Sequence, residues 1–417
     1  MGFDDLMEKL GKAARQATRS LAALDGEHRA QALRRCAAAI RNHQADLMAA
    51  NKQDLEAARE RGLAGAMLDR LELTAERIAA MADGLEAIAD LPDPLVRVLA
   101  EWTRPNGLRI QRVAVPIGVI GVIYESRPNV TADAAGLCLK SGNAVVLRGG
   151  SEAVASNRAI LAALHEGLEA ADVDQGAVQM LPTQDHEAVG AMLRAHQWLD
   201  MVVPRGGKRL VARVQADARV PVLAHLDGNN HLYIHSSAEA EMAVEVVANA
   251  KMRRPGICGA LETLLIDSDA LPMLPALVER LTELGCELRG DEALCDLDAR
   301  LVQASEEDWA TEYLDAILAM KVVDGPDEAL EHIAHYGSGH TDGIIAADEA
   351  VAAAFLVRLD SAIAVHNTST QFADGGEFGF GAEIGIATGR LHARGPVGVE
   401  QLTTFQYRVF GSGQTRS

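Results

Sequence analysis

The chain has 417 residues, 48% of them hydrophobic, and a formal net charge of −20 at pH 7. That length allows two or three domains, and the mean hydropathy of +0.02 is typical of a soluble protein. So large an excess of acidic residues disfavours nucleic acid and anionic membranes as partners. No apolar run reaches the roughly 20 residues that a membrane-spanning helix needs, and the polar, amphipathic start predicts no signal peptide. Five cysteines at unpaired spacings indicate a reducing compartment, so we expect a cytoplasmic location.

Helical patterns fill the first hundred residues. Apolar residues recur at helical spacing through residues 6–17 and again through 32–40, and Asp25-Gly26 interrupts the run between them. Thr74 can accept a hydrogen bond from a backbone amide at a helix start, which predicts another helix from residue 75 onward.

From Val113 onward, short apolar strands alternate with helices. Such alternation predicts parallel βαβ units in open sheets, and because it falls into two series we expect two α/β domains. The first series has strands at 119–124, 144–147, 177–181, 201–203, 220–223 and 232–234, with helices at 151–171 and 238–252. The second series has strands at 262–266, 318–323 and 343–346, with helices at 273–284 and 327–335.

A predicted hairpin interrupts this alternation. Asn106-Gly107 is a strong signal for a tight turn, and it joins extended stretches at 102–104 and 108–114. Because an isolated hairpin leaves its edges unpaired, we expect an oligomerisation arm. The alternating apolar residues of 400–409 predict a strand that pairs with such an arm in a partner subunit.

The segment 253–258, Arg-Arg-Pro-Gly-Ile-Cys, carries the strongest chemical signal in the chain. Its thiol follows a Pro-Gly turn and has two arginines within five residues. Nearby cations lower the pKa of a thiol, and the thiolate is the nucleophilic form. Cys258 is therefore a candidate nucleophile, although a free cysteine is often only a small buried hydrophobe.

Asn129 is a second candidate. It lies in the loop after the predicted strand 119–124, and the carboxyl ends of parallel strands carry ligand groups in open α/β sheets. Its carboxamide can donate a hydrogen bond to a developing oxyanion. An asparagine after proline also forms turns, so the residues alone leave both roles open.

Several motifs together resemble the aldehyde dehydrogenase superfamily. They are Pro128-Asn129, the Gly-Asn-Ala-Val-Val-Leu-Arg run at 142–148, Cys258 and the Glu-Tyr-Leu run at 312–314. A closer resemblance, to the branch of γ-glutamyl phosphate reductases, rests on residues 124–131, 203–208, 254–258, 336–341 and 394–398. The motifs follow the family's order through most of the chain.

The resemblance implies an aldehyde dehydrogenase-like α/β fold, with two Rossmann-like parallel-sheet domains and a small β-hairpin oligomerisation arm. Residues 1–100 and 116–225 are expected to form the cofactor-binding domain, and 226–394 the catalytic domain that carries Cys258. Residues 101–115 and 395–417 are expected to form the arm and its C-terminal strand.

The resemblance also implies an activity. It is the NADPH-dependent reduction of L-glutamyl 5-phosphate to L-glutamate 5-semialdehyde, the second step of proline biosynthesis from glutamate. Cys258 would expel phosphate and form a thioester that accepts hydride, while Asn129 and the Cys258 amide would hold the oxyanion. A homo-oligomer is expected, and glutamate 5-kinase is a candidate partner.

One segment departs from the oxidising members of the superfamily. Those enzymes have a Glu-Leu-Gly-Gly segment whose glutamate activates the hydrolytic water, whereas residues 225–231 here read His-Leu-Asp-Gly-Asn-Asn-His. His225 stands at the glutamate position, which favours reduction over hydrolysis. Asp227 lies two residues away and could take over the role of base.

The expected cofactor residues are carried over from the resemblance. In NAD-preferring members, a glutamate three residues after a lysine contacts the adenosine ribose, and here Arg148 and Ser151 occupy those two positions. A guanidinium without that carboxylate favours a 2′-phosphate, so we expect NADPH rather than NADH, although Arg148 could also be a solvated charge at a strand end. Further expected contacts are Gly206, Gly207 and Lys208 at the pyrophosphate and Glu312 at the nicotinamide ribose.

Substrate contacts are expected from arginines that can bind the phosphate and from the superfamily's anchoring loop. The predicted residues are Arg127, Arg254, Ser369 and Thr370. Each of the arginines could equally be a structural cation. His332 and His335 are three apart on a predicted helix, but the sequence places no third ligand, so we expect no metal site.

Two rival functions remain open at this point. One is a hydrolytic NAD(P)-dependent aldehyde dehydrogenase of broad substrate range, and the absence of a glutamate at position 225 argues against it. The other is a catalytically silent oligomeric protein, and the presence of both Cys258 and Asn129 argues against that.

Overall fold

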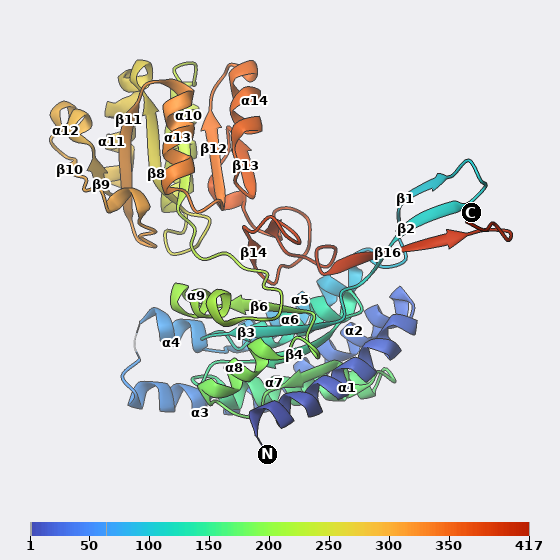
Figure 1. The fold of residues 1–417 in the computed structure, drawn as a ribbon. Coiled ribbons are helices and arrows are strands. Elements are labelled where there is room, and N and C mark those ends of the chain that lie inside the picture. The colour runs from blue at the N-terminus through green and yellow to red at the C-terminus, as the bar shows by residue number, and fades with distance from the viewer. Residues whose placement is uncertain (1, 64, 417) are drawn as a thin grey trace. The chain divides into compact units, whose positions relative to one another are not determined.

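The computed structural model describes residues 2–63 and 65–416, which form two compact units. Unit 1 consists of residues 2–224, 379–385 and 397–416, and unit 2 of residues 225–378 and 386–396. Each unit contains a parallel sheet accompanied by helices (Figure 1). The predicted class of fold is therefore confirmed.

Helices form the N-terminal part of unit 1, as the sequence predicts. They are α1 (Phe3–Ala23), α2 (Gly26–Asn42), α3 (Gln44–Glu60), α4 (Ala66–Leu71) and α5 (Ala75–Asp90). Asp25 caps α2 by accepting a hydrogen bond from the His28 amide at 2.7 Å, which explains why Asp25-Gly26 separates two helices. Thr74 caps α5 in the same way, through the Arg77 amide at 3.2 Å.

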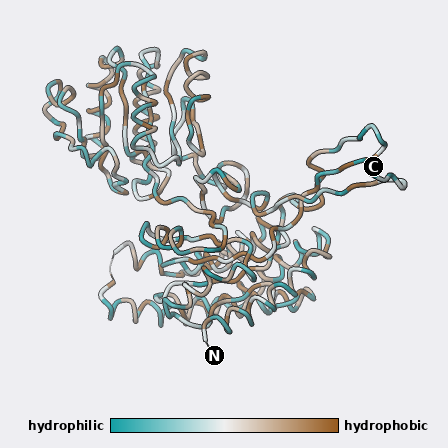
Figure 2. The backbone as a smooth tube through the Cα atoms, viewed as in Figure 1, coloured by the Kyte–Doolittle hydropathy of each residue, from teal (hydrophilic) through white to brown (hydrophobic). Residues whose placement is uncertain are grey.

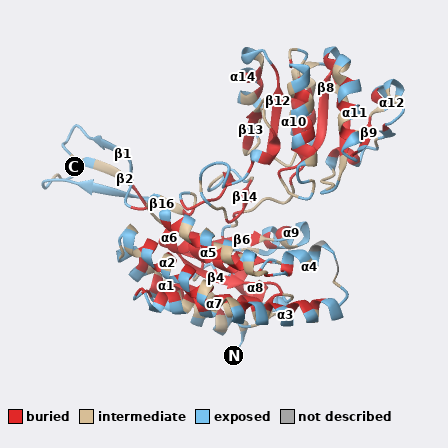
Figure 3. Cartoon of the chain, turned by 180° about the vertical axis from the view of Figure 1, so that it is seen from behind, coloured by how far each residue is buried: buried red, intermediate tan, exposed pale blue. Residues whose placement is uncertain are grey.

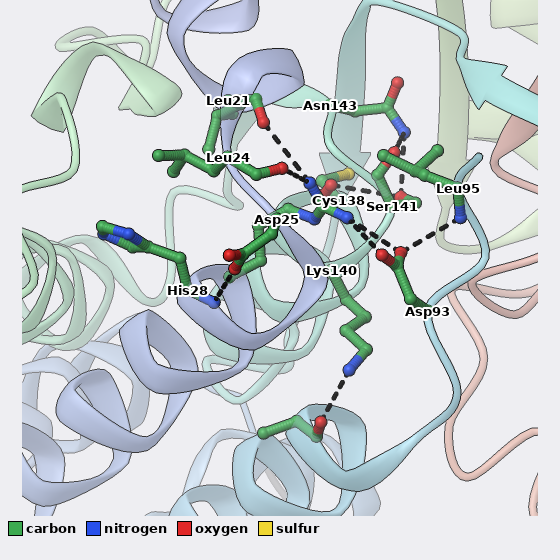
Figure 4. A network of polar contacts seen from close by, with 12 residues as sticks. Leu21, Leu24, Asp25, His28, Asp93, Leu95, Cys138, Lys140, Ser141 and Asn143 are labelled. Carbon is green, nitrogen blue, oxygen red and sulfur yellow. Dashed lines mark hydrogen bonds and ion pairs between the residues drawn. The ribbon is translucent and has the colours of Figure 1, made fainter.

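A buried arginine fixes the corner between α1 and α2. Arg29 is only 2% exposed, and its guanidinium donates to both carboxylate oxygens of Asp93 at 2.8 Å. It also donates to the backbone carbonyls of Leu21 and Leu24. Figure 4 labels its partners Asp93, Leu21 and Leu24. Because a buried charge is costly to leave unpaired, this network holds the corner against the segment that leads to β1.

A four-stranded parallel sheet forms the core of unit 1. Its strand order is β5 (Val178–Met180), β4 (Ala144–Arg148), β3 (Val119–Tyr124) and β6 (Met201–Arg205). The accompanying helices are α6 (Val130–Lys140), α7 (Val154–Glu169), α8 (His186–Arg194) and α9 (Lys208–Asp217). Every residue of β3 and β4 is buried, as expected for parallel strands covered by helices (Figure 3). The loops after β3, β4 and β6 leave the sheet at the same edge, because the strands are parallel.

The predicted hairpin belongs to a three-stranded antiparallel sheet, which we call the arm. It consists of β1 (Val98–Thr103), β2 (Arg109–Pro116) and β16 (Thr403–Phe410). Gly107 adopts a φ of +85° at the end of the turn, where its amide donates to the Arg104 carbonyl at 2.9 Å. Pairing of residues 400–409 with such an arm in a partner subunit stays a prediction; within its own chain, β16 pairs with β2. Asn143 helps to bring it there by donating to the Leu402 carbonyl at 2.8 Å.

Unit 2 is built on a seven-stranded parallel sheet. Its strand order is β10 (Val302–Gln303), β9 (Glu287–Gly290), β11 (Ile317–Val323), β8 (Leu261–Asp267), β7 (Asn230–Ile234), β12 (Thr341–Ile345) and β13 (Ile363–His366). Its helices are α10 (Ala240–Met252), α11 (Leu274–Glu283), α12 (Glu292–Leu297), α13 (Gly325–Tyr336) and α14 (Glu349–Arg358). A separate two-stranded pair joins β14 (Ile386–Ala387) to β15 (Gly395–Pro396). Throughout the described residues of both units, no helix is long and apolar enough to cross a membrane.

Two strand predictions need correction. Residues 220–223 make only an isolated bridge, from Val222 to Val202, because Pro221 lacks the amide that a ladder requires. Residues 232–234 belong to β7 in the sheet of unit 2 and not to the first series. Strands β9 and β10 were not predicted, since their sequences Glu-Leu-Arg-Gly and Val-Gln carry little apolar pattern.

Candidate active site

Cys258 lies in the loop between α10 and β8 of unit 2. The side chain of Asn230 donates to the carbonyls of Cys258 and Ala260, each at 2.7 Å. Its carbonyl oxygen accepts from the Thr341 amide at 3.1 Å. Gly228 approaches this loop so closely that a β-carbon there would lie 2.0 Å from the Cys258 carbonyl oxygen. The backbone that carries the thiol is thus held by the segments at the starts of β7 and β12.

The other cysteines differ from Cys258 in their surroundings. Cys36, Cys138 and Cys286 are buried, and burial raises the pKa of each thiol, to about 12 for Cys36 and Cys286. Cys295 is partly exposed, but burial also raises the pKa of its thiol. Cys258 combines partial exposure with two neighbouring histidines. The structure therefore favours Cys258 as the reactive thiol.

The two neighbouring histidines are His225 and His340. One nitrogen of each and the Cys258 sulfur all lie within 4.8 Å of one another. The Nδ1–H of His225 donates to the Ile386 carbonyl at 2.8 Å, and the two imidazole rings meet edge-on with centroids 5.1 Å apart. Burial lowers the pKa of His340 to about 3, so its ring is neutral at pH 7. His225, which the resemblance places at the position of the hydrolytic glutamate, thus lies beside the thiol.

Glu312 and a buried ion pair support the same region. Glu312 accepts a hydrogen bond from the Gly228 amide at 2.9 Å, so it holds the segment that packs on Cys258. The ammonium of Lys251 contacts the Glu262 carboxylate at 2.5 Å, and both side chains are fully buried. Burial raises the pKa of Glu262, while the ammonium opposes that shift. A contact between Glu312 and a cofactor remains a prediction.

Asn129 belongs to unit 1, where it precedes α6 at the carboxyl end of β3. Its carboxamide nitrogen donates to a carboxylate oxygen of Asp133 at 2.8 Å. Burial raises the pKa of Asp133 to about 6, although Asn129 and Arg205 act in the opposite direction. Asp133 thus orients the carboxamide, and no sequence signal singled it out. The role of Asn129 toward an oxyanion remains a prediction.

Arg148 and Ser151 lie at the end of β4, in the predicted cofactor region. Arg148 is 7% exposed and donates to the carbonyls of Gly149 and Gln184, each at 3.2 Å. Its Nε has no hydrogen-bond partner among the described residues. The carbonyl of Ser151 accepts from the guanidinium of Arg61 at 3.5 Å. Sequence reasoning missed Arg61 because it lies far from Ser151 in the chain, at the end of α3.

Gly206, Gly207 and Lys208 form the start of α9 directly after β6, as predicted. The Gly207 amide donates to the Glu125 carboxylate at 3.0 Å. A β-carbon on Gly206 would lie 2.4 Å from the same carboxylate, so a larger residue there would have to displace the Glu125 side chain. An anionic group of the protein therefore already lies at this helix N-terminus. The pyrophosphate contact remains a prediction, and it would have to share or displace Glu125.

The predicted substrate residues have different surroundings. Arg127 is exposed in unit 1, and Arg254 is exposed in unit 2. Ser369 and Thr370 are 4% and 0% exposed, and the Ser369 hydroxyl accepts from the Gln371 amide at 3.2 Å. Protein encloses both side chains in this structure. Contact of any of the four residues with a substrate remains a prediction.

These features define a class of protein. The chain has two parallel α/β sheets, a cysteine in a fixed loop before a strand and an asparagine at the carboxyl end of another strand. The model of the aldehyde dehydrogenase family matches residues 4–296. The chain belongs to this family.

Its relatives narrow the class to one branch. The chain is 61% identical to the γ-glutamyl phosphate reductase of Novosphingobium aromaticivorans over 412 residues, which cover 99% of this chain and 97% of the relative. It is 58% identical to the enzyme of the same name from Paramagnetospirillum magneticum over 415 residues, covering 99% and 98%. The crystal structure of γ-glutamyl phosphate reductase from Thermotoga maritima superposes with a TM-score of 0.97 at 43% identity, covering 99% of this chain and 100% of that one. The resemblance found in the motifs is thereby confirmed.

Proposed function

We propose that this protein reduces L-glutamyl 5-phosphate to L-glutamate 5-semialdehyde with NADPH and releases phosphate, through a thioester on Cys258. This reaction is the second step of proline biosynthesis from glutamate. The observation that carries the proposal is the Cys258 thiol, partly exposed in a loop that Asn230 and Gly228 hold in place. The names of the relatives support the choice of substrate.

The first half of the reaction forms the thioester. The sulfur of Cys258 attacks the acyl carbon, the C–S bond forms, and the C–O bond to phosphate breaks as inorganic phosphate takes the electron pair. The carbonyl oxygen carries negative charge in between, and the Cys258 amide and the Asn129 carboxamide are our candidate donors. The bond to Asp133 uses one N–H of that carboxamide and leaves a second N–H to donate.

The second half releases the aldehyde. Bound NADPH supplies a hydride to the carbonyl carbon of the thioester. Collapse of the thiohemiacetal then breaks the C–S bond, returns the Cys258 thiolate and frees glutamate 5-semialdehyde. In this proposal, the Cys258 amide and the Asn129 carboxamide stabilise the oxyanion in both tetrahedral intermediates.

A reductase gains nothing from hydrolysing its thioester, and His225 fits that requirement. It occupies the position of the water-activating glutamate of oxidising aldehyde dehydrogenases. Its Nδ1–H is engaged by the Ile386 carbonyl. The alternative function is a hydrolytic NAD(P)-dependent aldehyde dehydrogenase, for which Asp227 is the carboxylate available in the same segment.

For the cofactor we propose NADPH, with its 2′-phosphate near Ser151. Two guanidinium groups support this choice, since Arg61 contacts the Ser151 carbonyl and Arg148 ends the adjacent strand. The other proposed contacts are Gly206, Gly207 and Lys208 for the pyrophosphate and Glu312 for the nicotinamide ribose. The reaction as written uses no metal ion.

We propose that the arm joins copies of this chain in a homo-oligomer. Large apolar side chains of the arm are exposed, namely Trp102, Phe405, Tyr407, Val409 and Phe410. Hydrophobic and hydrophilic colours both occur along the arm (Figure 2), and the sequence of β16 alternates between the two kinds of residue from Phe405 to Val409. Exposed apolar groups beside unpaired strand edges favour association. A cytoplasmic location and a partnership with glutamate 5-kinase, which would supply the labile acyl phosphate, complete the proposal.

The reverse reaction tests the proposed function. Purified protein is mixed with glutamate 5-semialdehyde and NADP⁺, and NADPH is followed with and without inorganic phosphate or arsenate. We expect steady turnover only with one of these anions, because the thioester must be cleaved by an oxyanion of this kind. Steady turnover in their absence would favour the hydrolytic alternative, and no turnover under any condition would contradict both.

A further inference from the structure

We propose that Cys258, His225 and His340 together bind one thiophilic divalent cation of the Zn²⁺ class, and that the bound cation masks the Cys258 sulfur. This inference concerns the thiol that the proposed function uses, but it requires no turnover. It adds a reversible, metal-blocked form of the protein to the metal-free form that carries out the proposed reaction.

The first support is proximity. The three ligand atoms all lie within 4.8 Å of one another, and the three residues belong to unit 2. They come from separate segments, because His225 precedes β7, Cys258 precedes β8 and His340 precedes β12. The pairing of β7 with both β8 and β12 in one parallel sheet brings these segments together.

The hydrogen bonds of the histidines give the second support. The Nδ1 of His225 donates to the Ile386 carbonyl at 2.8 Å, and this tautomer places a lone pair on Nε2. The Nδ1 of His340 lies 2.9 Å from the Thr341 hydroxyl, which can accept in the same way. In zinc sites, a histidine typically donates a hydrogen bond from one ring nitrogen to a nearby acceptor while the other nitrogen binds the metal.

The third support is a buried nitrogen that lacks a partner. His340 is 0% exposed, and its Nε2 has no hydrogen-bond partner among the described residues. Leaving a buried polar atom unpaired costs free energy, so binding of a cation to the lone pair of this nitrogen is favoured. A cation bound to Nε2 and to the Cys258 sulfur meets this need.

The donor set selects the kind of metal. One thiolate and two imidazoles match Zn²⁺, which binds sulfur at about 2.3 Å and imidazole nitrogen at about 2.0–2.1 Å in tetrahedral geometry. Those bond lengths require ligand atoms roughly 3.3–3.6 Å apart, so modest side-chain rotations from the present arrangement suffice. Mg²⁺ and Ca²⁺ prefer oxygen ligands and are not expected to bind. With three protein ligands, the fourth position is left for water.

The pair His332 and His335, which the sequence places on one helix, does not form this site. His332 is buried against the rings of His231, Trp309 and Tyr336. His335 is exposed on α13 and provides a matched control, because its loss removes an imidazole without touching the three ligands.

The test uses the full-length, metal-free protein with Zn²⁺ or Co²⁺ alone as the probe. Equilibrium dialysis measures stoichiometry and affinity, and the absorption of Co²⁺ reports whether a thiolate is bound. Alkylation of each cysteine, followed by peptide mass spectrometry, reports whether the metal protects Cys258. We expect one tightly bound ion per chain, a thiolate–cobalt band, and protection of Cys258 but not of Cys295.

Variants decide which residues bind. His225→Gln and His340→Gln should each weaken Zn²⁺ binding by at least about tenfold, while Cys258→Ser should abolish the thiolate–cobalt band. His335→Gln should bind as the unmodified protein does. Thermal unfolding identifies any variant that fails to fold, and since His340 is buried, His225→Gln alone then decides the role of the imidazoles.

Three results would overturn the inference. They are absence of binding at micromolar Zn²⁺, unchanged binding by Cys258→Ser, and unchanged binding by both folded histidine variants. None of these results bears on the proposed reaction, which is measured separately in chelator-treated protein. Absence of reductase activity in the metal-free protein would instead contradict the proposed function, and it would not contradict the metal site.

Discussion

At Cys258 the chain combines a partly exposed thiol with two imidazoles and a backbone held by Asn230. Cys36 and Cys286 present the opposite case, since burial raises the pKa of each thiol to about 12. A thiol of that kind stays protonated at neutral pH and is a poor nucleophile. The difference between a reactive cysteine and an inert one therefore lies in the residues that surround it in the folded chain. These residues are far apart in the sequence.

Asn129→Ala should lower turnover by about 10²–10³-fold if the carboxamide stabilises the oxyanion. The matched variant is Asp133→Asn, which keeps a hydrogen-bond acceptor for Asn129 but removes its charge. We expect a smaller loss of kcat from Asp133→Asn, with KM for the acyl phosphate little changed in both variants. An effect of Asn129→Ala confined to KM would make Asn129 a binding or loop-shaping residue.

Asp133→Asn also has a predicted effect on stability. Burial raises the pKa of Asp133 from 3.8 to about 6 in the native state, so between these values the native state binds more protons than the unfolded state. The free energy of unfolding then falls as pH rises through this range. Above pH 6, the loss of stability from ionising the buried carboxyl is fully present. Asp133→Asn should therefore be more stable than the unmodified protein at pH 7.5, with little difference at pH 4. Urea unfolding at the two pH values measures this, and an equal effect at both would contradict the assigned pKa.

Ser151→Glu should reverse the charge where the 2′-phosphate of NADPH is proposed to bind. Like charges in a binding site cost several kcal/mol, so NADPH should bind at least about tenfold more weakly while NADH binds as before or better. Arg148→Ala and Arg61→Ala should each weaken NADPH without the same loss for NADH. Fluorescence titration of both cofactors gives the ratio. If all three variants keep the original NADPH/NADH ratio, the selectivity lies elsewhere, with Arg205 and Lys208 next to be tested.

At the scale of the elements, a buried ion pair joins α10 to β8. Lys251→Met should destabilise the protein by about 3–5 kcal/mol, because it leaves the Glu262 carboxylate buried without its partner. The double variant Lys251→Met/Glu262→Gln should recover much of that loss. Since burial already raises the pKa of Glu262, the single variant should lose more stability at pH 8 than at pH 6. Urea unfolding compares them, and equal stability of the single and double variants would show that the lone carboxylate carries no cost.

The sequence predicted most of the elements, and its errors have physical causes. Continuous apolar runs such as those of β3 and β4 were found because strands buried on both faces require them. Residues 220–223 also form an apolar run, but Pro221 cannot donate to a ladder. Strand β7 was placed in the wrong series, because the order of strands along the chain does not say which sheet each one joins.

The candidate site was only partly predictable for the same reason. Cys258 and Asn129 were selected for the chemistry of their side chains, whereas the proximity of Arg61 to Ser151 and of His340 to Cys258 arises only in the folded chain. Asp133 was also missed, because a lone acidic residue in a predicted helix has no distinctive pattern.

At the scale of the whole molecule, the arm should decide the oligomeric state. Tyr407→Glu places a charge among the exposed apolar side chains of the arm, next to Trp102 and Phe405. Gln406→Glu adds the same charge on the opposite face of β16, because successive side chains point to opposite faces. Analytical ultracentrifugation should show a smaller species for Tyr407→Glu and no change for Gln406→Glu. A monomeric unmodified protein, or equal behaviour of the two variants, would contradict the proposed interface.

The central claim is that the acyl group passes through Cys258, and trapping that group tests it most directly. Protein is mixed with glutamate 5-semialdehyde and NADP⁺ without phosphate, quenched in acid, and digested for peptide mass spectrometry. We predict a burst of about one NADPH per active site, in step with an acyl adduct on the Cys258 peptide and none on the Cys295 peptide, and neither burst nor adduct in Cys258→Ser. NADPH formation without an adduct on Cys258, or with an adduct at another residue, would contradict the account.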